Sequence, residues 1–194
     1  MDVAEQTYVR VHATEPASRV NGPGTRMVIW FAGCSLGCPG CYNPNTHDPT
    51  AGTRIALVEL IAQVNGALAP GLSLSGGEPM EQPEAALALA TAARAAGKTV
   101  LMFSGHTLDE IRAHALGPRI LAQLDVLIDG RYRADQRRAH GLRGSDNQII
   151  HLLSDAYSRA DVEATAEAEI RIAPDGSVVL SGVNPIKAKD LIRR

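Results

Sequence analysis

The fold of this chain follows most directly from the stretch Leu72-Ser73-Leu74-Ser75-Gly76-Gly77-Glu78-Pro79. Its short apolar start predicts a strand over Leu72–Ser75, which leads straight into a glycine pair and an acid. The next segment predicts a helix from Pro83, a favoured first helical residue, to Ala96. A second apolar run, Thr99–Phe103, follows. A strand, a helix and a strand in this order indicate a parallel pair joined by a right-handed crossover.

The same alternation extends in both directions along the chain. A second helix is expected from Arg54, with Thr53 as its N-cap, to about Gly66, and a third, short helix is expected to be capped by Thr107 and to end before Gly117. The other expected strands are Met27–Phe31, Val126–Asp129, Gln148–Leu152 and Glu169–Ile172. These strands are too few for a closed eight-stranded barrel. We therefore expect an α/β fold, an incomplete, open βα barrel with about five or six mostly parallel strands.

The C-terminal part of the sequence has a different pattern. Glu169–Ile172, the turn residues Pro174-Asp175-Gly176 and then Val178–Leu180 predict a β-hairpin. No internal repeat and no long linker divides the chain. We expect a core over residues 1–152 and a C-terminal extension over residues 153–194 that packs on the same domain.

Composition excludes several classes of protein. The chain has 194 residues, of which 45% are hydrophobic and 21% charged, an ordinary globular mixture. The formal net charge of -2 provides no basic field for nucleic acid. No apolar run is long enough for a membrane span, and the N-terminus lacks a secretory pattern, so we expect a cytoplasmic protein without a membrane partner.

All three cysteines of the chain, Cys34, Cys38 and Cys41, lie in one octet directly after the strand Met27–Phe31. This clustering in a chain expected to be cytosolic favours a metal site over a disulfide. Three thiolates hold three irons of a cubane, where four would saturate it. The open iron can then be chelated by an amino and a carboxylate group, both of which S-adenosylmethionine supplies. The alternative is a zinc site with His47 as the fourth ligand.

The Gly76-Gly77-Glu78 segment adds a second indication of the same chemistry. Two glycines let the main chain approach a ligand closely, and their carbonyls can accept from an ammonium group. Glu78 supplies a counter-charge for that ammonium. The alternative is an ordinary strand-to-helix turn, with Glu78 near a helix N-terminus.

With these motifs the chain resembles the radical S-adenosylmethionine superfamily, and more narrowly the activating enzymes of the anaerobic ribonucleoside-triphosphate reductase. The matching stretches keep their order over roughly residues 20–152. They are Asn21-Gly22-Pro23-Gly24-Thr25-Arg26, Gly33-Cys34, Cys38-Pro39-Gly40-Cys41-Tyr42-Asn43, Leu74-Ser75-Gly76-Gly77-Glu78-Pro79, Leu108-Asp109-Glu110, Val126-Leu127-Ile128-Asp129-Gly130 and Arg143-Gly144-Ser145-Asp146-Asn147-Gln148.

The resemblance implies a role for particular residues around the two motifs. Cys34, Cys38 and Cys41 would ligate a [4Fe-4S] cluster. Gly40 and Tyr42 flank the third cysteine, where relatives contact the adenine of S-adenosylmethionine. The segment Gly76-Gly77-Glu78 would meet the methionine ammonium.

Three further positions are implied at strand ends and in a turn. Ser104 lies where relatives contact the ribose or the methionine carboxylate. Asp129 matches an acidic position near the site, and its alternative is a strand-end residue that bonds a nearby turn. Asn147 is expected close to the cofactor, and its alternative is a turn-forming asparagine.

The leading functional hypothesis is a glycyl-radical-enzyme activase that takes a hydrogen atom from a glycine of a larger partner protein. A one-electron donor such as flavodoxin or ferredoxin would reduce the cluster. His47 and the turn Phe103-Ser104-Gly105-His106 depart from the reductase activases, which leaves two alternatives open. One is a stand-alone radical enzyme that modifies a small molecule, nucleoside or peptide, and the other is a zinc-binding interaction module. No general base is needed for hydrogen-atom transfer, so no histidine is expected to be catalytic.

Overall fold

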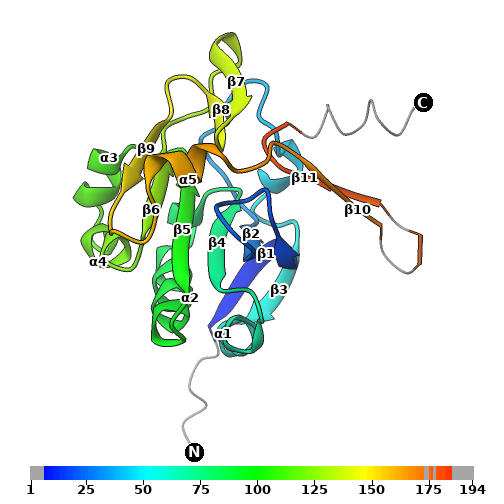
Figure 1. Cartoon of the computed structure of the whole chain (residues 1–194). Coiled ribbons are helices and arrows are strands. Elements are labelled where there is room, and N and C mark those ends of the chain that lie inside the picture. The colour runs from blue at the N-terminus through cyan, green and yellow to red at the C-terminus, as the bar shows by residue number, and fades with distance from the viewer. Residues whose placement is uncertain (1–6, 173–174, 177, 185–194) are drawn as a thin grey trace, which may run out of the picture.

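A computed structural model describes residues 7–172, 175–176 and 178–184 (Figure 1). Its strands and helices, with three short 3-10 turns labelled η, follow in chain order. They are β1 (Tyr8–Ser18), β2 (Arg26–Phe31), η1 (Pro44–Thr46), β3 (Thr53–Ala56), α1 (Leu57–Gly66), β4 (Gly71–Gly76), η2 (Pro79–Glu81), α2 (Pro83–Ala95), β5 (Thr99–Ser104), α3 (Leu108–Ala113), α4 (Gly117–Leu121), β6 (Val126–Asp129), η3 (Ala134–Gln136), β7 (Arg137–His140), β8 (Arg143–Ser145), β9 (Ile149–Leu152), α5 (Arg159–Glu163), β10 (Glu169–Ile172) and β11 (Val178–Ser181).

A seven-stranded sheet in the order β3-β1-β2-β4-β5-β6-β9 organises the molecule. The neighbours β2, β4, β5 and β6 are parallel, which confirms the crossovers expected from the alternation of strands and helices. β1 and β9 pair antiparallel to their neighbours, and β3 pairs antiparallel to β1, so five of the seven strands share one direction. Within the described residues β3 and β9 are the two free edges, and the sheet is open.

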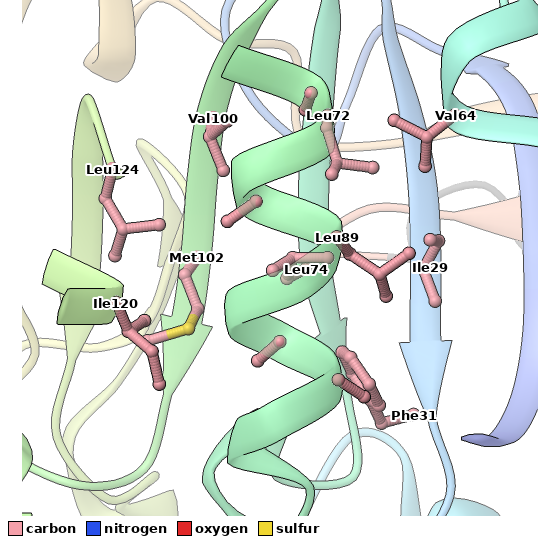
Figure 2. Packing of buried hydrophobic residues seen from close by; sticks show 14 of the residues in the cluster. Ile29, Phe31, Val64, Leu72, Leu74, Leu89, Val100, Met102, Ile120 and Leu124 are labelled. Atoms are coloured by element: carbon pink, nitrogen blue, oxygen red, sulfur yellow. The ribbon is translucent and has the colours of Figure 1, made fainter. Parts of the chain in front are cut away.

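Helices cover one face of this sheet. Leu89 of α2, Val64 of α1 and Ile120 of α4 are fully buried against strand residues in one cluster. Figure 2 shows these side chains packed with Ile29, Leu74 and Met102 of β2, β4 and β5. Because side chains alternate along a strand, the residues between these face the opposite side of the sheet. A smaller cluster forms on this second face, where Val162 of the short helix α5 packs with residues of β5, β6 and β9.

The predicted helix from Arg54 is wrong at its start. Thr53–Ala56 is instead the strand β3, which pairs with Tyr8–Val11 of β1, and Ala56 takes the N-cap position of α1. The strand β1 itself was not predicted, although Val9 and Val11 alternate with polar residues in the pattern of a half-buried strand. The pairing of β1 with β3, two segments far apart in the sequence, determines that both form strands.

The other helix predictions hold with small changes of boundary. α2 begins at Pro83 and ends at Ala95. Thr107 caps α3 through a reciprocal capping box with Glu110, as the sequence indicated. α3 ends at Ala113, and Gly117 begins the additional short helix α4.

The predicted C-terminal hairpin is confirmed as the antiparallel pair β10–β11, beside the main sheet in Figure 1. Gly176 in its turn has a φ of 83°, and Pro174, also predicted in this turn, lies outside the described residues. The hairpin joins the rest of the molecule through β1 and the segment that follows it. No helix in the described part of the chain is long and apolar enough to cross a membrane.

Candidate active site

The three cysteines lie in the loop between β2 and η1, at the carboxyl end of a parallel strand. Main-chain bonds hold the loop at both ends: the Cys34 N–H donates to the His47 carbonyl at 3.1 Å, and the Cys41 N–H donates to the Cys38 carbonyl at 3.1 Å. Ligands bind at this edge in open α/β sheets. The loop thus has a fixed start and a turn between its second and third cysteine.

The thiols are half-buried, and main-chain N–H groups act on two of them. The Asn43 N–H donates to Cys41 Sγ at 3.4 Å, and the main-chain N–H groups of Leu36 and Gly37 act to lower the pKa of Cys34. Burial raises the pKa of the Cys34 and Cys41 thiols, while these N–H donors oppose the shift. Hydrogen bonds of this kind tune the thiolates of iron–sulfur clusters.

Three thiols in one loop suit a cubane in which each thiolate binds its own iron and one iron stays open. Among the residues that the structure describes, no three His, Cys, Asp or Glu side chains gather closely enough to hold a single metal ion. A zinc site needs all of its ligands at about 2.0–2.3 Å from one ion, whereas a cubane offers each thiolate its own iron. His47, the fourth ligand of the zinc alternative, contributes its carbonyl to the Cys34 N–H.

The glycine pair is required by the protein's own main chain. A Cβ on Gly76 would lie 2.4 Å from the Phe31 nitrogen, and one on Gly77 would lie 2.1 Å from the Gly33 oxygen. Gly76 also has a φ of 105°, in the region that favours glycine. Gly76 therefore lets the end of β4 press against the end of β2, and Gly77 lets the turn press against the loop that carries the cysteines, rather than only against a ligand.

Glu78 lies at the centre of this contact and is 1% exposed. One carboxylate oxygen accepts from the Met80 N–H at 2.9 Å and from Ser104 Oγ at 2.8 Å, and the other accepts from the Gly105 N–H at 2.7 Å. Burial raises the pKa of the Glu78 carboxyl. Burial also raises the pKa of the Cys34 thiol, and the negative charge of Glu78 raises it further. The structure thus brings Cys34, Glu78 and Ser104 together and shows Glu78 joining the ends of β4 and β5.

Tyr42 and Gly40 lie on the opposite side of the cysteine loop. The Tyr42 hydroxyl donates to the Gly144 carbonyl at 3.1 Å, and its ring packs against that of Tyr132 at an interplanar angle of 47°, with the centroids 4.7 Å apart. The pKa of the Tyr42 hydroxyl is raised to about 12, mainly because the group is partly buried. Gly40 has a φ of 72°, and a Cβ there would lie 3.2 Å from that of Ala134. These contacts fix the end of the loop against the β7–β8 region.

Asp129 and Asn147 have structural partners in the described residues. An oxygen of Asp129 accepts from the Leu108 N–H at 2.5 Å, at the start of α3, and lies 3.1 Å from His151 Nε2. This is the nearby-turn contact that was the alternative for Asp129. Asn147 donates to the Arg131 carbonyl at 2.9 Å, while its buried Oδ1 has no hydrogen-bond partner in the described protein. A buried acceptor in this state can be satisfied by a ligand donor.

A cavity of about 320 Å³ opens on the face of the sheet opposite α1, α2 and α4. Trp30, Ser75 and Phe103 line it, and each is the residue before the last of β2, β4 or β5. Trp30 and Ser75 are also register partners. Tyr42 and Asn43, next to the third cysteine, line the same cavity. The cavity therefore adjoins the cysteine loop at the carboxyl ends of the parallel strands.

The sequence reasoning missed these cavity residues. Trp30, Ser75 and Phe103 precede the loop residues that were predicted, and the alternation of side chains along each strand would have placed them on one face. Tyr132 and Gln148, two other lining residues, come from loops and have no such pattern. Residues 179–183 also line the cavity, although no function was assigned to the hairpin from the sequence.

A family described as "4Fe-4S single cluster domain" matches residues 20–151. The "anaerobic ribonucleoside-triphosphate reductase-activating protein" of Salmonella typhi is 34% identical over 155 residues, which cover 75% of this chain and 99% of that protein. The chain belongs to this family of activating proteins. The relative from Enterobacteria phage T4 is 31% identical over 161 residues, which cover 79% of this chain and 99% of the relative.

Membership in the activating-protein family confirms the resemblance to radical S-adenosylmethionine enzymes. The protein is accordingly an enzyme, and its cofactors are a [4Fe-4S] cluster and S-adenosylmethionine. Among solved structures, QueE from Escherichia coli has a TM-score of 0.44 and 16% identity and covers 52% of this chain and 54% of that one. A similarity at this level carries no argument about this protein.

Proposed function

We propose that this activating protein installs a glycyl radical on an anaerobic ribonucleoside-triphosphate reductase. The observation that carries the proposal is the match to reductase-activating proteins over 99% of their length, which spans the cysteine loop and the Gly-Gly-Glu turn. The substrate is then a glycine Cα–H bond on the partner protein.

Cys34, Cys38 and Cys41 are the proposed ligands of the cluster. Their loop supplies three thiols and an N–H donor to the sulfur of Cys41, and the chain has no fourth cysteine. A cluster held in this way keeps one iron open for the amino and carboxylate groups of S-adenosylmethionine.

The residues around the loop are proposed to bind S-adenosylmethionine. Gly76, Gly77 and Glu78 would face its ammonium. Glu78 would also act indirectly, because its bonds to Ser104 and Gly105 hold the end of β4 in place. Gly40 and Tyr42 would lie at the adenine, and Ser104, held by Glu78, at the ribose or carboxylate.

Asp129 and Asn147 are proposed at the periphery of the same site. The unpartnered Oδ1 of Asn147 supports a donor from the cofactor, while Asp129 fixes the start of α3 beside it.

When bound, the cluster and S-adenosylmethionine supply a carbon radical that takes a hydrogen atom from the glycine. The chain's own contribution is to hold the cofactors at the carboxyl ends of the strands and to keep water from them. The aromatic rings of Trp30, Tyr42 and Phe103 around the cavity suit this exclusion of water. No proton needs to move in the hydrogen-atom transfer, so the site needs no general base.

Three finer assignments accompany this function. We propose that the open seven-stranded sheet corresponds to an incomplete βα barrel, with residues 1–152 as the catalytic core and residues 153–194 as an extension on the same domain. The electron donor is proposed to be a flavodoxin or ferredoxin. The cytoplasm is the proposed location, because free thiols that bind a cluster need a reducing compartment.

The test is electron paramagnetic resonance of the reductase from the same organism, incubated without oxygen with the reconstituted activating protein, a reductant and S-adenosylmethionine. We expect a glycyl-radical doublet that is absent when the target glycine of the reductase is replaced by alanine. A stand-alone enzyme would form 5′-deoxyadenosine with another substrate and leave the reductase without a radical, and that result would contradict the proposal.

A further inference from the structure

The C-terminal hairpin contributes one wall of the cavity, and it does so in an unusual way. Five consecutive residues, 179–183, line the cavity. Successive side chains of a strand point to opposite faces, so a strand that presents only a face would contribute every second residue. Three of the five, Val179, Leu180 and Ser181, are consecutive residues of β11 itself, which indicates that β11 borders the cavity with its main-chain edge.

That edge is available for pairing. β11 pairs with β10 on one side only, and the described residues place no strand on its other side. A free strand edge presents a row of N–H and C=O groups that can pair with an extended peptide. Here the edge adjoins a cavity whose other walls include polar side chains, among them His12, Asn21 and Gln148.

Polar contacts fasten the inner face of the hairpin to β1 and the segment after it. Glu169 accepts from Ser18 Oγ at 2.5 Å and from the Arg19 N–H at 3.1 Å. Arg171 forms an ion pair with Glu15, whose side chain is 5% exposed. A two-stranded hairpin alone is only marginally stable in water. These contacts therefore hold β11 at the cavity rather than leaving it to solvent.

The outer face of the hairpin differs from the inner one. Ile172 is 70% exposed and pairs in register with Val178, on the side opposite Arg171 and Val179. The hairpin thus offers a pair of matched positions on opposite faces: Val179, which lines the cavity, and Ile172, which does not.

The hairpin also lies beyond the part of the chain that the 4Fe-4S family matches, which ends at residue 151. The relatives are covered almost completely by about three-quarters of this chain. Cofactor chemistry shared with those relatives therefore does not require the hairpin. Its place outside the matched region is compatible with a role in recognising the substrate.

We propose that β11 is the substrate-recognition edge of this enzyme: the glycine-bearing segment of the partner enters the cavity in an extended conformation and pairs through its main chain with the free edge of β11. Main-chain pairing suits a glycine target, because glycine offers no side chain for recognition. The inference rests on the proposed activase function and adds to it the element that binds the peptide.

The first test compares Val179→Trp with Ile172→Trp in the reconstituted enzyme. Val179→Trp fills the cavity beside β11, and we expect the glycyl-radical yield on the reductase to fall at least 10-fold. The formation of 5′-deoxyadenosine without the reductase, under chemical reduction, should stay within twofold of the parent. Ile172→Trp adds the same side chain to the exposed face and should leave both values within twofold.

Each other outcome has a definite meaning. A Val179→Trp enzyme with a normal radical yield contradicts the proposal, as does an equal loss in Ile172→Trp. Loss of 5′-deoxyadenosine together with the radical in Val179→Trp would assign the cavity wall to the cofactor and also contradict it. If the parent enzyme makes 5′-deoxyadenosine but no radical on the reductase, the proposed function fails separately from the recognition edge.

The second test measures main-chain pairing directly, by calorimetric titration of the holoenzyme with synthetic peptides copied from the glycine loop of the reductase. One peptide is N-methylated at odd positions and another at even positions. A strand that pairs along one edge uses every second N–H. We expect one methylated peptide to bind at least 10-fold more weakly than the parent peptide and the other to bind within twofold. Equal affinities, or equal losses in both, would contradict edge pairing.

Discussion

Replacing Gly77 with alanine tests the contact between the Gly-Gly-Glu turn and the cysteine loop. The new Cβ would lie 2.1 Å from the Gly33 oxygen and 3.0 Å from the Thr46 oxygen, and ordinary contact begins near 3.4 Å. Both neighbours are main-chain atoms, so no side chain can rotate away. The two segments must separate by more than 1 Å, and the bond from the Glu78 N–H to the Gly33 carbonyl, at 2.8 Å, is lost.

The magnitude follows from these two effects. Overpacking costs about 1–3 kcal/mol, and a lost hydrogen bond about 0.5–1.5 kcal/mol. The free energy of unfolding should therefore fall by about 2–4 kcal/mol. The effect on activity should be larger in relative terms, since a displacement of about 1 Å can cost about 10²-fold in rate. The displaced atoms belong to the loop that carries the proposed cluster ligands.

The assay compares Gly77→Ala with Gly66→Ala for iron content after reconstitution, thermal midpoint and the rate of 5′-deoxyadenosine formation. A Cβ on Gly66, the last residue of α1, meets no atom within 4 Å, so this variant should match the parent in all three. We expect Gly77→Ala to lose about 100-fold in rate. A Gly77→Ala enzyme with parental iron content and a rate within twofold would refute the reasoning from backbone contact.

Three further predictions concern the scaffold. Leu89→Ala, at a fully buried position of α2, should lower the free energy of unfolding by about 2–5 kcal/mol in chemical denaturation, and a loss below 1 kcal/mol would be inconsistent with the packing in Figure 2. Arg26→Lys should cost at least about 3 kcal/mol in the same assay, because the five N–H groups of the buried guanidinium lie within hydrogen-bond distance of six oxygen acceptors, and an ammonium has only three N–H groups. A neutral result would contradict this account. The bond from Arg131 lowers the pKa of Glu110 to about 2 from its ordinary 4.5, so the pair stabilises the fold above pH 4.5 and this contribution is lost as the pH falls toward 2. In Arg131→Gln, an NMR titration should show the pKa of Glu110 moving back toward 4.5. The free energy of unfolding should fall by less than about 1 kcal/mol, because both side chains are partly exposed. An unchanged pKa of Glu110 would exclude Arg131 as the cause of the shift.

The parallel strands were predictable because each is a short apolar run that ends in a glycine or a polar residue. The edges of the sheet were not. β3 was taken for the start of a helix because Thr53 is a good N-cap, but its pairing with β1 across more than forty residues outweighs that local preference. The antiparallel direction of β9 likewise depends on the chain path through the β7–β8 hairpin, which has no apolar periodicity.

The site was predictable to the extent that it lies in contiguous motifs. The cysteine loop and the Gly-Gly-Glu turn could be predicted directly from the sequence. Three cysteines within eight residues indicate a metal site, and two consecutive glycines indicate a close approach of the main chain. The physical role of Gly77 was only partly foreseen: a ligand was expected opposite it, and the structure places the main chain of Gly33 there. The cavity wall formed by β11 could not be foreseen, because only tertiary packing brings residue 179 to the same cavity as the ends of β2 and β4.

The central claim is that three cysteines in one loop support radical chemistry with S-adenosylmethionine. The most direct measurement is 5′-deoxyadenosine formation by protein purified without oxygen, reconstituted with iron and sulfide and given reductant, S-adenosylmethionine and the reductase, with Cys38→Ala in parallel. The account predicts product in the parent and none in the variant. A protein that binds zinc, takes up no cluster and forms no 5′-deoxyadenosine would contradict it.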